Sequence, residues 1–221
     1  MAYSDTAAVI FDMDGIIFDT ERLYIESWKA VGEEFGLENV VEMAYKIIGV
    51  NETMSRKVFT EYYQGMKDYD LCRKRLSEVF HSRYDGRIPV KPGVREILAF
   101  LKEREIPIAL ASSTRIETVQ RELKEAGLYQ AFDHIIGGDM IKQSKPAPDI
   151  FLAAAQKLGA APESCYVLED SHNGIRAAAA AGMHPIMVPD LLEPTDEMQK
   201  LAETICPSLN EAIDYLRRRL P

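Results

Sequence analysis

The 221-residue sequence contains few cysteines and no long hydrophobic run. Its three cysteines, Cys72, Cys165 and Cys206, are odd in number and show no C-x-x-C spacing, which argues against a disulfide framework. No apolar stretch approaches the length of about 18 residues that a membrane span needs, and no basic segment followed by an apolar one opens the chain. We therefore expect reduced thiols in a cytoplasmic protein that is neither secreted nor membrane-spanning.

Positive charge is also scarce, because 26 Lys and Arg stand against 35 Asp and Glu, for a formal net charge of −9. A nucleic acid or an anionic membrane would be repelled unless the chain carried a concentrated basic patch. The basic cluster Arg217 to Arg219 follows apolar residues at helical spacing, so it fits the last turn of an amphipathic helix. We expect no nucleic-acid partner, no membrane partner and a monomer.

Apolar residues make up 47% of the chain, and five short apolar runs have the composition of buried parallel strands. These runs are AVIF after Ala7, IPIALA from Ile106, HII from His134, CYVLE from Cys165 and PIMV from Pro185. Helical patterns lie between the later runs. Thr114 with Glu117 predicts a capping box for a helix that ends near Gly127. The alternation predicts an α/β fold with a doubly wound, Rossmann-like parallel sheet.

The segment from residue 20 to residue 87 interrupts this alternation. Tyr24, Trp28, Val31 and Phe35 form one helical stripe, and no convincing strand follows. Asn51 and Asp68 are candidate caps of two further helices in this segment. We therefore predict an all-helical cap at 20–87, inserted between core segments 1–19 and 88–221. A cap at this point would hang over the C-terminal edge of the sheet and could close on a substrate; a helical decoration without a gating role is the alternative.

The first predicted strand ends in the motif DMDGIIFDT, in which Asp12 and Asp14 lie two positions apart. Ligands of open α/β sheets bind at the carboxyl ends of strands, so two acids there indicate a magnesium site. An ordinary turn with solvated acids is the alternative reading. A calcium loop does not fit, because Ile16 and Leu23 occupy the places where that loop needs an oxygen ligand and a glutamate.

Polar residues also follow three later strands. Ser112, Ser113 and Thr114 offer hydroxyl groups at a helix start, which suits a phosphoryl oxygen, although plain capping is the alternative. Lys145 lies in the stiff loop SKPAPDIF, where a lone lysine would ordinarily be solvated. Glu169 and Asp170 follow CYVL, and taken alone they would be explained by a solvated strand end followed by a helix cap. Four such sites at the strand ends of one sheet indicate a functional site more specifically than any one of them does alone.

Together these motifs resemble those of the haloacid dehalogenase superfamily, in its phosphatase and β-phosphoglucomutase-like branch with a small helical cap. DMDGIIFDT, LASST, SKPAPDIF and LEDSHNGIRAAAAAGM correspond in order and spacing to the four family motifs. The dehalogenases themselves lack the second acid of the first motif. Asp14 therefore points to phosphoryl transfer and away from carbon–halogen cleavage.

The resemblance implies a role for each motif. Asp12 would attack phosphorus and form an aspartyl-phosphate, and Asp14 would act as general acid and then as general base. Asp12, the backbone carbonyl of Asp14 and Asp170 would bind Mg²⁺. The phosphate would be bound by Lys145, Ser112 and Ser113, and Glu169 would orient Lys145 or a metal-bound water.

The sequence departs from the β-phosphoglucomutase pattern in the cap. The family segment G-V-S-R, whose basic residue grips a second phosphate, reads GVNET here, so Asn51 and Glu52 occupy the candidate specificity positions. An acidic residue would repel a second phosphate, so we favour a phosphatase acting on a small phosphorylated metabolite, a phosphosugar, over a phosphohexomutase. Five neighbouring cations, Arg56, Lys57, Arg73, Lys74 and Arg75, keep the mutase open as an alternative. A non-enzymatic receiver-like module is a weaker one, since such modules are shorter and lack a helical insertion.

Overall fold

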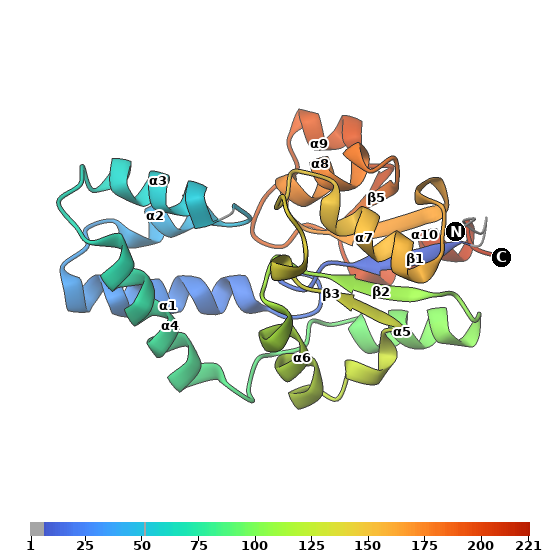
Figure 1. Ribbon diagram of the computed structural model, residues 1–221, viewed down its shortest axis with the longest axis horizontal. Coiled ribbons are helices and arrows are strands. Elements are labelled where there is room, and N and C mark those ends of the chain that lie inside the picture. Colours follow the sequence, from blue (N-terminus) through green and yellow to red (C-terminus); the bar gives the residue numbers. More distant parts are fainter. Residues whose placement is uncertain (1–6, 51) are drawn as a thin grey trace.

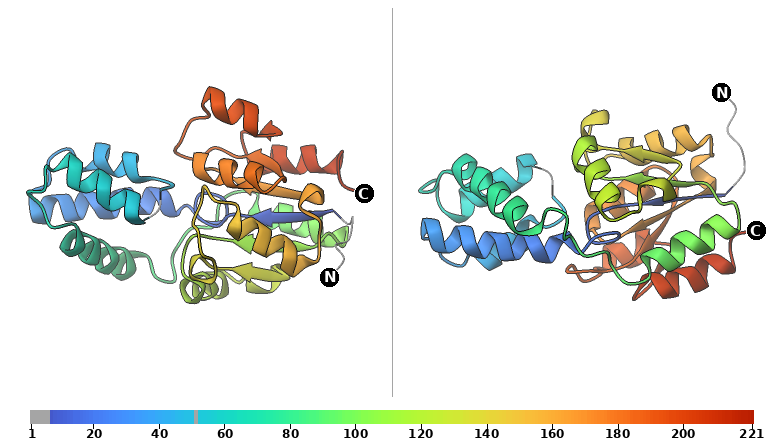
Figure 2. Two further views of the ribbon diagram at one scale, coloured as in Figure 1. Left: turned by 45° about the horizontal axis from the view of Figure 1, so that its top comes forward. Right: turned by 90° about the horizontal axis from the view of Figure 1, so that it is seen from below.

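The computed structural model describes residues 7–50 and 52–221. Figure 1 shows two parts: a core, in which helices flank a central sheet, and a group of helices beyond one end of that sheet. We call this second group, residues 20–84, the cap. The views in Figure 2 place the cap beyond the same end of the sheet.

The core sheet has six strands, and each neighbouring pair is parallel. The strands are β1 (Ala8–Phe11), β2 (Ile108–Ala111), β3 (His134–Ile136), β4 (Cys165–Glu169), β5 (His184–Met187) and β6 (Thr204–Ile205). They lie in the order β3-β2-β1-β4-β5-β6, so the direction of winding reverses between β1 and β4. A crevice forms at such a point, outside the carboxyl ends of the two strands. The doubly wound α/β fold predicted from the sequence is confirmed.

All five strands predicted from the sequence are present, and the sequence did not predict β6. This strand has two residues, both half-buried, at the edge of the sheet. A run so short carries no periodic pattern, since the period of a strand is itself two residues.

Side chains of β1 alternate between the two faces of the sheet, as the pleat requires. Val9 and Phe11 pack in one cluster with α5 (Val94–Glu103), α6 (Ile116–Glu125) and α10 (Leu209–Arg217). Ala8 and Ile10 pack in another with α7 (Asp149–Leu158) and α8 (His172–Ala180). A small cluster of Ile175, Met187 and Met198 attaches α9 (Asp196–Leu201) near the β6 edge. Because both faces are covered, the strands read as continuous apolar runs.

The cap consists of α1 (Thr20–Phe35), α2 (Val40–Ile47), α3 (Glu52–Tyr62) and α4 (Tyr69–Tyr84). It has a hydrophobic cluster of its own, in which Trp28 and Phe59 pack with Leu76. Of the predicted stripe, Trp28 and Val31 are buried, whereas Tyr24 is 37% exposed. The predicted cap of α4 is confirmed, because the Asp68 side chain accepts a hydrogen bond from the Leu71 N–H at 3.1 Å. The predicted cap at Asn51 lies outside the described residues.

Two linkers join the cap to the core, and they run side by side. Phe18 forms an antiparallel bridge with Val90. The Asp19 N–H donates to the Pro89 carbonyl at 3.0 Å, and the Lys91 N–H donates to the Ile17 carbonyl at 2.9 Å. The backbone pairing fixes where the cap leaves the core, above the carboxyl end of β1.

Two further expectations concern single residues and helices. The capping box of Thr114 and Glu117 is wrong: α6 begins at Ile116, its cap residue is Arg115, and the Ile116 N–H donates to Asp139 Oδ1 at 2.9 Å. The cysteines are free and buried. No helix within residues 7–50 and 52–221 combines the length and the apolar character needed to cross a membrane.

Candidate active site

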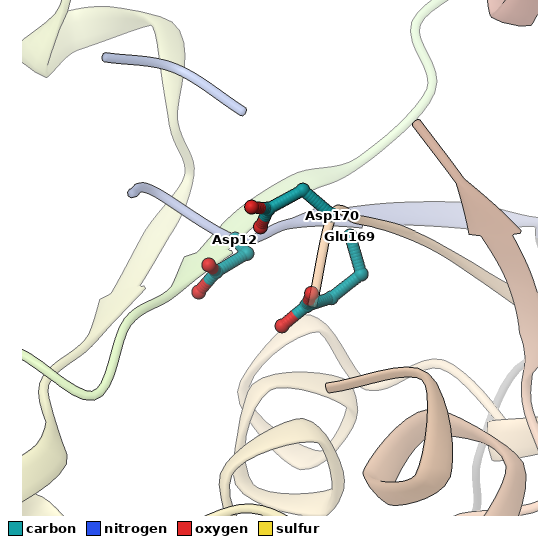
Figure 3. A group of neighbouring side chains, drawn as sticks. All are labelled: Asp12, Glu169 and Asp170. Carbon is teal, nitrogen blue, oxygen red and sulfur yellow. The ribbon is translucent and has the colours of Figure 1, made fainter. Parts of the chain in front are cut away.

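Three carboxylates meet at the point where the sheet reverses its winding. Asp12 follows β1 directly, Glu169 is the last residue of β4, and Asp170 follows it. All three are buried, and one oxygen of each lies within 4.8 Å of the others. Figure 3 shows these side chains gathered at the ends of the two neighbouring strands. The Asp12 N–H donates to the Leu168 carbonyl at 3.0 Å, so the parallel pairing of β1 and β4 sets their relative positions.

Lys145 joins this group from the loop before α7. Its ammonium Nζ lies 2.6 Å from Asp12 Oδ1 and 2.8 Å from Glu169 Oε1, and the side chain is only 7% exposed. Burial would lower the pKa of Lys145, but the carboxylates of Asp12 and Glu169 outweigh that effect and raise it. The lysine is therefore a buried cation, and the solvated alternative is excluded.

The Asp14 side chain points to the neighbouring hydroxyl groups. Thr20 Oγ1 donates to Asp14 Oδ1 at 2.7 Å, and Thr114 Oγ1 donates to Asp14 Oδ2 at 3.2 Å. Ser112 Oγ lies 3.4 Å from Asp14 Oδ2 and accepts a hydrogen bond from the Thr114 N–H at 3.0 Å. This is the physical reason for the failed capping box: the Thr114 hydroxyl bonds to Asp14 instead of to its own helix. Ser113 is exposed and lines the cavity described below.

The carboxylate group fits a divalent cation. Burial raises the pKa of Asp12 to about 7, although Lys145 opposes the rise, and burial followed by Glu21 raises the pKa of Asp170. Asp170 Oδ2 is buried and has no hydrogen-bond partner within the described part of the chain. Gly15 has a φ of +79°, and a Cβ there would lie 2.3 Å from this oxygen. Carboxylate oxygens without protein donors, held in a close cradle, are the ligands that Mg²⁺ prefers.

Sequence reasoning missed two further acids, Glu21 in α1 and Asp190 after β5. With Asp170 they form a second group whose carboxylate oxygens lie within 4.8 Å of one another. Burial, followed by Asp190, raises the pKa of Glu21 to about 8. Asp190 Oδ1 also lies 2.7 Å from Lys91 Nζ and 3.6 Å from Arg22 Nη2. Lys91 belongs to the second linker between cap and core, and Arg22 belongs to α1. No local sequence signal links the two acids, since only the fold brings them together.

A cavity of about 820 Å³ extends from the carboxylates into the cap. Its core side includes Asp12, Asp14, Lys145, Asp170 and an arginine that the sequence analysis did not single out, Arg115. Its cap side is largely aromatic and apolar, with Tyr24, Trp28, Tyr69 and Phe80 among the lining residues. The core side of the cavity is thus polar, and its cap side is largely apolar.

Besides Glu21, which lies beside Asp170, the charged cap residues that line the cavity are Glu52 and Arg73. Glu52 had been singled out from the sequence, and its Oε2 lies 3.5 Å from Arg73 Nε. Of the other candidate cations, Arg56 pairs with Asp70, Arg75 with Glu34, and Lys57 with Glu61. Arg73 is therefore the member of that set of five that lines the cavity. Asn51, the second predicted specificity residue, lies outside the described residues.

Known proteins resemble the chain over most of its length. A family model described as haloacid dehalogenase-like hydrolase matches residues 9–188. A phosphatase of phosphorylated carbohydrates from Thermotoga maritima is 36% identical over 179 residues, which cover 81% of this chain and 83% of the relative. A candidate pseudouridine-5′-phosphatase from Drosophila melanogaster is 34% identical over 192 residues, covering 82% of this chain and 80% of the relative. The crystal structure of a candidate β-phosphoglucomutase from Thermotoga maritima superposes with a TM-score of 0.79 and 32% identity, covering 97% of this chain and 100% of the other.

Proposed function

The chain belongs to the haloacid dehalogenase-like hydrolases, and on that premise we propose a magnesium-dependent phosphatase that hydrolyses a small phosphosugar through an aspartyl-phosphate. The family relationship identifies a hydrolase acting on phosphate monoesters. The observation that carries the proposal is the buried group of Asp12, Lys145 and Asp170 at the base of a capped cavity. We keep the division into core segments 1–19 and 88–221 and a cap at 20–87 as part of this proposal.

In the first half of the reaction, the Asp12 carboxylate forms a bond to phosphorus as the bond between phosphorus and the leaving oxygen breaks. Asp14 gives a proton to that leaving oxygen. In the second half, water attacks phosphorus, Asp14 takes a proton from the water, and the bond to Asp12 breaks to release inorganic phosphate. The hydrogen bonds from Thr20 and Thr114 support this role, because they hold the Asp14 carboxyl in one orientation.

Positive charge is needed because an anionic carboxylate must approach an anionic phosphate. The Lys145 ammonium, 2.6 Å from Asp12, provides one such charge, and Glu169 holds it there at 2.8 Å. Ser112 and Ser113 offer further donors for the phosphoryl oxygens. Asp12, the backbone carbonyl of Asp14 and Asp170 would hold Mg²⁺. When bound, Mg²⁺ offsets the repulsion between carboxylate and phosphate.

Three observations bear on the choice between a phosphatase and a mutase. The Thermotoga relative acts on phosphorylated carbohydrates, which supports a phosphosugar substrate. The structural likeness to a candidate β-phosphoglucomutase, together with Arg73 and Arg115 in the cavity, keeps a phosphohexomutase as the second candidate. Glu52 beside Arg73 favours the phosphatase, because it would repel a second phosphate. The receiver-like module is excluded by membership of a hydrolase family.

The free cysteines support a reducing compartment, the cytoplasm.

The test combines a substrate panel with an Asp12 variant. Phosphosugars, pseudouridine 5′-phosphate and p-nitrophenyl phosphate are assayed for free phosphate with and without Mg²⁺. The Asp12→Asn protein should fold like the wild type but lose at least about a thousandfold in turnover. Asp214→Asn, at an exposed site on α10, is the matched control and should keep wild-type activity. An Asp12→Asn protein that retains more than a few per cent of the activity would remove Asp12 from the nucleophile role.

The mutase is tested separately. We incubate the protein with β-glucose 1-phosphate, Mg²⁺ and a trace of the bisphosphate. The proposed phosphatase should release inorganic phosphate or leave the substrate unchanged. Fast formation of glucose 6-phosphate would establish the second candidate.

A further inference from the structure

The Glu52–Arg73 pair differs from the other ion pair that joins the same two helices. Arg56 of α3 and Asp70 of α4 form a bidentate pair with distances of 2.8 and 2.5 Å, and neither residue lines the cavity. Glu52 and Arg73 do line it, and their 3.5 Å separation is longer than a good hydrogen bond. The Arg56–Asp70 pair thus satisfies its own charges outside the cavity. The other presents a guanidinium and a carboxylate to whatever occupies the cavity.

The charges of this pair select for the type of group that it can bind. A second phosphate would be attracted by Arg73 and repelled by Glu52. Hydroxyl groups suit both partners, because a hydroxyl can accept from a guanidinium N–H while its neighbour donates to a carboxylate. A carboxylate and a guanidinium side by side therefore match two adjacent hydroxyl groups better than they match an anion.

The surroundings of the pair are suited to a sugar ring. Tyr24 lines the cavity and stacks on Phe80, with ring centroids 4.4 Å apart and an interplanar angle of 17°. Burial, followed by the Asp14 carboxylate, raises the pKa of Tyr24, whereas Arg73 lowers it. Tyr24 therefore lies within electrostatic range of both the core carboxylates and the cap arginine. The C–H face of a sugar can pack on such a ring while its hydroxyls reach the charged pair.

We propose that Arg73 and Glu52 form a subsite that binds adjacent hydroxyl groups of the sugar leaving group. This inference rests on the proposed phosphatase function and adds the residues that set its specificity. It explains why the cap can carry an acid where a mutase carries a base: the acid is half of a hydroxyl-binding pair.

The first experiment measures selectivity. The ratio of kcat/KM for the best hexose or hexitol phosphate of a panel to kcat/KM for p-nitrophenyl phosphate, which has no hydroxyls, is compared between variants. Arg73→Met should lower this ratio about tenfold or more, as expected for a lost charge-assisted contact. Arg56→Met breaks the matched pair outside the cavity and should keep the wild-type ratio. An Arg73→Met protein with the wild-type ratio, or with equal losses on both substrates, overturns the proposal.

The second experiment uses opposite charges to exclude a merely structural role. Inhibition by a hexose bisphosphate should strengthen about tenfold in Glu52→Gln and weaken about tenfold in Arg73→Met, since only one of these variants removes the repelling charge. A general disturbance of the cap would shift both inhibition constants in the same direction, and that result would refute the pair as a binding site.

The third experiment needs no variant, so it remains decisive if Arg73→Met does not fold. Removing one of two adjacent hydroxyls from the substrate should lower kcat/KM of the wild-type protein about tenfold or more. Deoxy analogues that are all hydrolysed like the parent would contradict the proposal. A wild-type protein that hydrolyses p-nitrophenyl phosphate but shows no such selectivity leaves the phosphatase intact and removes the subsite. One that hydrolyses no monoester removes both.

Discussion

At the scale of single residues, Lys145 shows how its surroundings determine what a side chain can do. A lysine in a polar loop is ordinarily solvated. Here its ammonium is buried between Asp12 and Glu169, and with both carboxylates ionised the three residues carry a formal net charge of −1. The charge of this triad is therefore a property of the three residues together.

Asp14→Asn is expected to separate chemistry from metal binding. The substitution keeps the backbone carbonyl and the hydrogen bond from Thr20, but an amide cannot give a proton to the leaving oxygen. Turnover of alkyl phosphates should fall by about two to four orders of magnitude. Phosphorylation of Asp12 by p-nitrophenyl phosphate should fall less, because nitrophenolate leaves without a proton. Rapid-quench rates for both substrates test this, and equal losses would show that Asp14 is not the acid.

Glu122 is expected to make stability depend on pH. Burial, followed by the Asp14 charge, raises the pKa of Glu122 from 4.5 to about 7. Between these values the folded protein holds a proton that the unfolded chain releases, so this group stabilises the fold at low pH, and its contribution falls as pH rises towards 7. Glu122→Gln should therefore be more stable than wild type by about 1–3 kcal/mol at pH 8, with little difference near pH 4.

Urea unfolding of both proteins across this pH range measures the effect. Glu103→Gln, at an exposed site on α5, provides the control. A stability difference between wild type and Glu122→Gln that does not change with pH would contradict a raised pKa at Glu122.

At the scale of elements, the start of α8 holds the acids in place. Ser171 caps the helix by accepting from the Gly174 N–H at 3.0 Å, and the Ser171 N–H donates to Glu169 Oε2 at 2.5 Å. The end of β4 and the first turn of α8 thus form one unit, in which the glycine leaves room for the Glu169 side chain. The NGI at the start of the helix is part of the site although none of its side chains was assigned a role.

Gly174→Ala is expected to damage catalysis through Glu169. A Cβ at this position would lie 1.6 Å from Glu169 Oε1, so the carboxylate must move and lose its 2.8 Å contact with Lys145. We expect kcat to fall about tenfold or more, although alanine favours a helix over glycine. In a Glu169→Ala background, Gly174→Ala should cost little further activity, because the carboxylate that the added Cβ would displace is absent. Equal costs in both backgrounds would place the effect elsewhere.

At the scale of the whole molecule, the buried acids should link metal binding to stability. Six acids, Asp12, Asp14, Glu21, Glu169, Asp170 and Asp190, lie in the two groups or beside them, near the linkers that join cap and core. A cation that binds only the folded protein stabilises it by about 2.7 kcal/mol at a hundredfold excess over Kd. For a chain of this size, Mg²⁺ should therefore raise Tm by about 5–10 °C.

Thermal unfolding with Mg²⁺ and with EDTA measures this shift without any assay of activity. Asp170→Asn should lose most of the shift, whereas Glu103→Gln should retain it. An Asp170→Asn protein with the full shift would show that the cation binds elsewhere. Turnover should also stop in EDTA, return with Mg²⁺ and stay low with Ca²⁺, whose looser coordination misplaces the reacting groups.

Local sequence was sufficient for five of the six strands and for the four motifs. The apolar runs from Ala8 and Cys165 predicted β1 and β4, and their ends predicted where Asp12, Glu169 and Asp170 would lie. This works because parallel strands place their carboxyl ends at one edge, so consecutive positions in the sequence fix positions in the site. The helical nature of the segment that contains α1, α3 and α4, and the Asp68 cap of α4, followed from the same local patterns.

The tertiary structure decided which distant side chains meet. Thr114 bonds to Asp14 although the sequence offered it a capping box, and Glu21 approaches Asp190 across the linkers. Of five similar cations in the cap, only the packing of α3 against α4 directs Arg73 to the cavity while Arg56 pairs with Asp70. Such choices depend on the relative placement of whole elements, and hydrogen bonds or ion pairs between remote residues leave no periodic trace in the chain. Local pattern therefore determined most of the fold and the four motifs, and the contacts between elements determined the surroundings of the side chains in those motifs.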